Sequence, residues 1–150
     1  MPVTSPTGLT ITNNFKNILD KLRNILRTEF KGALPVYVGH ENKEAGTQYL
    51  RLDPVNSVLV EYNSTGELKE FTVDLLYYFS EPNVNKNALD QVLRITSRIE
   101  ALIHDNTAMT LSDSSKAVNC RMQSTQLNAG DDDMYVVEWD YKCMHMGNIG

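Results

Sequence analysis

Two stretches of period-two alternation constrain the fold of this chain most. The first runs from Glu67 to Phe79, and its apolar positions are Phe71, Val73, Leu75, Tyr77 and Phe79. The second runs from Met134 to Met144, and its corresponding positions are Tyr135, Val137, Trp139, Tyr141 and Cys143. Successive side chains of a strand point to opposite faces of a sheet, so each stretch predicts a half-buried strand with one core face.

Helical patterns precede and separate these two strands. Residues 13–31 place apolar side chains at steps of three and four, with Asn13 or Asn14 as a possible N-cap and Gly32 as the C′ residue. Residues 88–104 repeat the helical spacing, from Ala88 to His104. Both stretches predict amphipathic helices that bury one stripe of side chains.

Shorter β-rich runs complete the order of elements. Pro35–His40, Thr47–Leu52 and Ser57–Tyr62 precede the first long strand, with Pro54 ending the second run, and Ala117–Leu127 precedes the last strand. The order is one helix, three or four strands, one helix and two strands, written α-βββ-α-ββ for short. It predicts an α+β fold: a mainly antiparallel sheet of five to six strands with two helices packed on one face. The expected core residues are Leu22, Leu26, Phe71, Val73, Leu75, Val92, Ile99 and Trp139.

Length and charge limit the class of protein. A chain of 150 residues fits one domain. We expect an arm at 1–12, one domain at 13–146 and a tail at 147–150. The net charge of -5 argues against wrapping of duplex nucleic acid. No apolar run is long enough to span a membrane, and the N-terminus lacks the pattern of a secretory signal.

The sequence carries no motif for a catalytic, cofactor or metal site. P-loop, dinucleotide-binding, zinc-protease and serine-hydrolase patterns are missing. The histidines His40, His104 and His145 fall at the ends of predicted elements, as solvated or helix-end histidines do. We therefore expect no enzyme activity and no cofactor.

Two groups of side chains invite a metal hypothesis, and a third, Glu138 and Asp140 with Asp133, invites the hypothesis of paired catalytic carboxylates. A hairpin between the last two strands would place Cys120 opposite Cys143, with His145 on the same face, but metal-site spacing is absent and buried thiols are the simpler interpretation. Asp131–Asp133 lack the EF-hand pattern and fit a solvated turn. Glu138 and Asp140 share a strand face that we expect to face solvent.

The chain resembles the tail-terminator and tail-completion proteins of tailed bacteriophages. The resemblance rests on the helix Asn13–Lys31 before Pro35–Val38, the strand ending at Ser80, the helix Ala88–His104 and the closing strand Tyr135–Tyr141. It implies a ring, usually a hexamer, that caps the tail tube and contacts the tube protein and a head-completion or neck protein. DNA would pass through an acidic lumen without sequence-specific binding, in a virion assembled in the host cytoplasm, with no membrane contact.

Other functions remain open at this stage. They are a head–tail connector adaptor, a tail-tube-like protein, or a small ligand-binding or enzyme domain with a pocket near His40, Tyr62 or Trp139. For a ring, polar loops and sheet edges are the expected contact or lumen elements. The candidates lie at 41–46, 63–66 and 128–133, and are Glu41, Lys43, Glu44, Ser64, Thr65, Asp131, Asp132 and Asp133.

Overall fold

The computed structural model describes residues 3–4, 10–11, 14–31, 34–39, 48–62, 66–80, 88–129 and 134–148. These residues form, in order, β1 (Val3–Thr4), β2 (Thr10–Ile11), α1 (Asn14–Phe30), β3 (Val36–Val38), β4 (Gln48–Tyr62), β5 (Gly66–Ser80), α2 (Ala88–His104), β6 (Met109–Thr110), β7 (Lys116–Ala129) and β8 (Met134–Asn148). The short strands β1 and β2 pair with each other inside the expected N-terminal arm.

The main sheet has six strands in the order β3-β4-β5-β8-β7-β6. The predicted α+β class is confirmed, and the prediction of five to six strands holds in part, since β4 joins two of the expected strands and β6 was not expected. The sheet is mixed, because β3 pairs with β4 in parallel. The prediction of antiparallel pairing assumed that consecutive strands form hairpins. Here β3 is only three residues long, and residues 39–47 provide enough chain to return to the starting end of the sheet.

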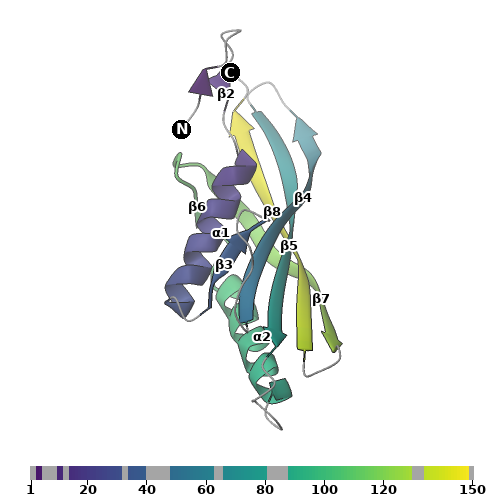
Figure 1. Cartoon of the computed structure of the whole chain (residues 1–150). Helices are drawn as coiled ribbons and strands as arrows, with labels where there is room; N and C mark the ends of the chain where they lie inside the picture. The colour runs from purple at the N-terminus through teal and green to yellow at the C-terminus, as the bar shows by residue number, and fades with distance from the viewer. Residues whose placement is uncertain are drawn as a thin grey trace.

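Both helices lie on the same face of the sheet, as Figure 1 shows. α1 buries Ile18, Leu19, Leu22, Leu26 and Phe30, and they join one core cluster with the alternating apolar residues of β5 and β8. All eight predicted core residues are buried, and the most exposed of them, Phe71, is only 4% exposed. The period-two pattern therefore identified the helix-covered face correctly.

Polar contacts fix the helices over this core. Arg98 of α2 donates from Nε to Glu29 Oε1 of α1 at 2.9 Å, and its guanidinium lies 4.8 Å from the centroid of the Phe30 ring. Trp139 of β8 donates from Nε1 to Glu100 Oε1 at 3.1 Å. Among the described residues, neither helix is long and apolar enough to cross a membrane.

The predicted break at Pro54 is wrong, because β4 is one strand of 15 residues that continues through it. The register between β4 and β5 shifts between Pro54 and Asn56. A bulge of this kind, in a strand without a partner on its outer side, tolerates a residue that has no backbone N–H. The result is a much longer β4–β5 hairpin than the sequence indicated.

At the end of α1, Lys31 has a left-handed conformation, with φ of 50°. Gly32, the expected C′ residue, lies outside the described residues. The N–H of Lys31 donates to the Arg27 carbonyl at 2.8 Å, which closes the last turn of the helix.

Candidate assembly surfaces

The eight residues proposed from the sequence as contact or lumen candidates all lie outside the described residues. Both hairpins that carry such loops are confirmed by the pairing of Tyr62 with Glu67 and of Ala129 with Tyr135. The roles of the loop residues stay predictions; the residues are Glu41, Lys43, Glu44, Ser64, Thr65, Asp131, Asp132 and Asp133.

A row of three carboxylates crosses the sheet on the face opposite the helices. Asp53 of β4 pairs in register with Asp74 of β5, and Asp74 pairs in register with Asp140 of β8. Side chains in such cross-strand positions lie about 5 Å apart at their Cβ atoms, and like charges there repel. We call Asp53, Asp74 and Asp140 the acidic row.

The electrostatics of Asp74 reflect this crowding. Partial burial raises the pKa of its carboxyl first, and the negative charges of Glu138, Asp53 and Asp140 raise it further, against the opposing effect of Arg51. Arg51 is engaged with Asp53, whose Oδ2 accepts from Arg51 Nε at 2.9 Å. The acidic row is thus only partly neutralised within the subunit.

Other side chains of this open face form small clusters above and below the acidic row. Tyr49 and Tyr78 stack with ring centroids 4.9 Å apart. Towards the opposite end, Glu70 accepts from Arg121 Nη2 at 3.0 Å, and Lys142 donates to Thr72 Oγ1 at 3.2 Å. The open face is therefore organised by polar and aromatic pairs without a covering helix.

The outer half of β4 is exposed and apolar. From Pro54 to Tyr62 every residue is exposed. Its large side chains are between 51% and 64% exposed and are Val55, Val58, Leu59, Val60 and Tyr62. An apolar strand exposed in this way is typical of a surface that meets another protein, since isolated subunits otherwise aggregate through it.

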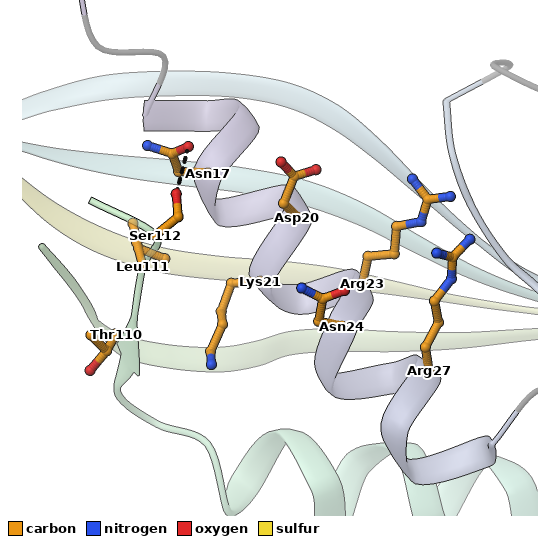
Figure 2. A pocket seen from close by; sticks show the side chains of 9 residues that line it. All are labelled: Asn17, Asp20, Lys21, Arg23, Asn24, Arg27, Thr110, Leu111 and Ser112. Atoms are coloured by element: carbon orange, nitrogen blue, oxygen red, sulfur yellow. Dashed lines mark hydrogen bonds between the residues drawn. The ribbon is translucent and has the colours of Figure 1, made fainter. Parts of the chain in front are cut away.

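A polar groove of about 480 Å³ lies beside α1, between the helix and residues 110–112. Figure 2 shows Ser112 Oγ donating to Asn17 Oδ1, at 3.3 Å, at one end of it, and the guanidinium groups of Arg23 and Arg27 at the other. Lys21 adds a third cation and Asp20 one carboxylate. A cationic helix surface on an acidic chain suits contact with acidic groups, although such faces are commonly just solvated.

Cys120 and Cys143 lie next to each other, as a hairpin between the last two strands would place them. Cys120 and Cys143 are free and buried, and a hydrogen bond from Cys143 lowers the pKa of Cys120. That hydrogen bond and burial raise the pKa of Cys143. Within the described part of the chain, no three His, Cys, Asp or Glu side chains are placed to hold a metal ion.

His145 has a different role from the one considered in the metal hypothesis. Its Nε2 lies 2.8 Å from Ser115 Oγ, and Ser115 also donates to Asp113. Burial lowers the pKa of His145, with an opposing effect from Asp113. The serine lies between the acid and the histidine, so the arrangement lacks the order of a nucleophile–base–acid triad. It holds the turn before β7 against β8.

The acidic row is the feature that sequence reasoning missed. Glu138 and Asp140 were recognisable as strand-face carboxylates, and Asp74 lies on the polar side of its alternating pattern. Their alignment depends on the register of three strands, which local sequence does not specify. Of the alternative pocket positions, His40 lies outside the described residues, Trp139 is buried, and Tyr62 is 64% exposed near the hairpin end.

Comparisons with known proteins find the fold but no sequence relative. No protein-family model matches the chain, and no curated protein matches it. A chain of the "virion of native gene transfer agent (GTA) particle" superposes with a TM-score of 0.65 at 11% identity, covering 91% of this chain and 100% of that one. A second solved chain, whose name states no function, superposes with a TM-score of 0.58 at 15% identity, covering 93% and 99%. At these identities the likeness shows a shared fold.

Proposed function

We propose that this chain is a structural protein of a virion, a subunit of the ring that ends the tail tube and joins it to the head. The observation that carries the proposal is the full-length match to a virion chain, which leaves no part of that chain unaccounted for. Apart from the two-residue strands β1, β2 and β6, the order of elements is the α-βββ-α-ββ order of the tail-terminator and tail-completion proteins, which supports the same assignment.

The open face of the sheet supports a lumen role. The acidic row places Asp53, Asp74 and Asp140 side by side on a surface that neither helix covers. Carboxylates on such a surface repel phosphate groups, so DNA could move past it without sequence-specific binding. The three aspartates at 131–133 extend the negative charge of the chain near the β7–β8 hairpin.

The exposed apolar part of β4 supports assembly with other subunits. Removal of its five large apolar side chains from water in a subunit contact stabilises the assembled state. The partners in this proposal are further copies of the same chain, arranged as a hexamer, the tail tube protein below and a head-completion or neck protein above. Assembly takes place in the host cytoplasm and the site of action is the tail of the virion.

The oligomeric state of the purified chain tests the ring. Size-exclusion chromatography with light scattering and negative-stain microscopy should show a closed particle at a whole multiple of the 17.0 kDa subunit mass. A chain that stays monomeric at all concentrations, with and without tube protein, contradicts the proposal.

A deletion in the parent phage separates the terminator from its alternatives. Loss of a terminator should leave tails of uncontrolled length, because nothing stops growth of the tube. Loss of a tube subunit should leave no tails, and loss of a connector adaptor should leave tails of normal length that fail to join heads.

A further inference from the structure

Four long strands form a block with a stretch of unpaired edge on each side. On one side, β4 pairs with β3 only from Leu50 to Leu52. On the other side, β7 pairs with β6 at Lys116 and Ala117, and its last outward backbone hydrogen bond runs from Cys120 N–H to the Thr107 carbonyl at 3.0 Å. Beyond these points, residues 54–62 of β4 pair only with β5 and residues 121–129 of β7 pair only with β8, so no described strand pairs with the outer side of either stretch. We call these stretches the β4 edge and the β7 edge.

The two edges match in length and differ in chemistry. Each spans nine residues. The β4 edge is apolar and carries one charge, from Glu61, whereas the β7 edge is mostly Ser, Thr, Gln and Asn and carries one charge of opposite sign, from Arg121. Both lie at opposite sides of the same sheet, as the strand order requires. Two unlike patches on one subunit are what a head-to-tail contact between identical copies needs.

We infer that the β4 edge of one copy pairs with the β7 edge of the next copy, so that the sheet continues from subunit to subunit around the ring. This inference rests on the proposed ring and specifies its contact. The strand directions agree with it. β4, β5, β8 and β7 alternate in direction, so β4 and β7 run opposite ways. Rotation about a ring axis preserves direction, and the new pair is therefore antiparallel like its neighbours.

The positions of the edges along the sheet fix the tilt of the strands. Val58, at the middle of the β4 edge, is level with Glu70 of β5. Ser124, next to the middle of the β7 edge, is level with Asp140 of β8 and hence with Asp74 of β5, so its side chain lies on the same face of the sheet as that of Val58. These two positions are thus four residues apart along β5, or ~14 Å, against a lateral repeat of four strands, or ~19 Å.

This offset corresponds to strands tilted by ~35° from the ring axis, at the lower end of the ~35–45° of closed barrels. A tilt of that size is what a closed ring of sheets requires, so the offset is compatible with cyclic assembly. If a second copy occupies the β4 edge, the β4 and β7 edges are expected to match in length, to run in opposite directions and to have a suitable offset along the sheet. An unrelated protein would impose none of these relations on the β7 edge.

A cross-linking experiment tests the pairing directly. Cys120 and Cys143 are first replaced by Ala, since they are the two cysteines of the chain. Val58→Cys and Ser124→Cys, which lie on the same face of the sheet, are then introduced together, and assembled protein is treated with a short bismaleimide. We expect a ladder of covalent oligomers on a denaturing gel, while each single cysteine variant stays monomeric. A covalent dimer from Val58→Cys alone would show a symmetric β4–β4 contact and overturn the inference.

Substitution of matched leucines provides the second measurement. Leu59 on the β4 edge is 51% exposed and Leu127 on the β7 edge is 43% exposed. Leu59→Lys or Leu127→Lys should weaken assembly about tenfold or more and leave the thermal unfolding of the monomer unchanged. Leu93→Lys is the control, because Leu93 is 45% exposed and lies on α2.

The outcomes distinguish failure of the edge pairing from failure of the ring function on which it rests. Rings that persist in both edge variants, with no cross-linked ladder, would overturn the edge pairing and leave the ring function standing. A wild-type chain that forms no ring under any condition would overturn both. Loss of rings in Leu93→Lys as well would show that the contact involves the helical face, and this too would contradict the pairing.

Discussion

The helix-covered face of the sheet carries buried apolar side chains, whereas the open face carries partly exposed charged ones. On β5, Val73, Leu75 and Tyr77 face the helices and are completely buried. The intervening Asp74 faces the other way and aligns with two further carboxylates. Burial of apolar side chains on the helix-covered face stabilises the fold. Repulsion between like charges on the open face offsets part of that stabilisation. The contrast agrees with the proposal that the open face lines the lumen of a ring.

Exposure along β4 shows the same contrast within one strand. Leu50 and Leu52 are completely buried beneath the helices, whereas Leu59 and Val60 are about half exposed, at 51% each. The strand keeps its β-rich composition after it leaves the core. An isolated subunit obtains little stability from this outer half, so we expect its apolar side chains to matter for assembly and not for folding.

The largest expected difference is in the free energy of unfolding lost when each of two leucines is replaced by alanine. Leu75→Ala should lower the free energy of unfolding by about 2–5 kcal/mol, because Leu75 is completely buried. Leu59→Ala in dilute monomer should cost less than about 0.5 kcal/mol. Urea unfolding followed by circular dichroism measures both, and equal losses would show that the two regions do not differ as described.

Sequence reasoning succeeded where the decisive interaction is local. The alternation of residues 71–79 and 135–143 specified which side chains face the core, and helical spacing placed α2 from Ala88 to His104. Sequence reasoning failed where contacts between distant segments determine the strand pairing. The parallel pairing of β3 depends on the path of residues 39–47, and the alignment of Asp53 with Asp74 depends on strand register. Neither can be obtained from periodicity alone.

The second prediction concerns pH and the covered face. Burial lowers the pKa of His145 below its ordinary value of 6.5. The unfolded chain therefore binds a proton first as the pH falls below 6.5, and the stability present above that value is lost as the pH falls through the folded pKa. Urea unfolding on either side of pH 6.5 should show this loss in the wild type.

His145→Gln is the matched variant for that experiment. Glutamine keeps a side-chain amide that can bond to Ser115 Oγ but does not titrate. Its stability should be flat where that of the wild type declines. The same decline in both proteins would place the proton-binding group elsewhere.

The third prediction concerns Asp74 on the open face, where stability changes with pH in the opposite direction. The pKa of Asp74 is raised above 3.8, so the unfolded chain loses its proton first and stability falls as the pH rises through that region. Asp74→Asn should therefore stabilise the monomer at neutral pH by about 0.2–1 kcal/mol, a small gain because solvent screens the charges. Added salt should stabilise the wild type and have less effect on the variant; an Asp74→Asn monomer less stable than wild type would contradict the repulsion.

The smallest effect on folding is expected in the β7–β8 loop. Replacing Asp131, Asp132 and Asp133 together with Ala should leave the unfolding free energy of the monomer almost unchanged, because charges in polar turns contribute little to stability. The proposal expects the change to appear in assembly instead. Ring contacts, tube capping or DNA passage should be impaired, as measured by tail length and by DNA release from particles.

A control of equal charge separates position from net charge in this last experiment. Asp20, Asp90 and Asp105 lie on or next to the helices, and their joint replacement with Ala removes the same three negative charges. If the loop is a contact or lumen element, only the loop variant should lose infectious particles. Because the control also lowers repulsion between whole subunits, equal defects in both variants would assign the effect to net charge. Normal tails and normal DNA release in the loop variant would exclude the loop from the ring's function.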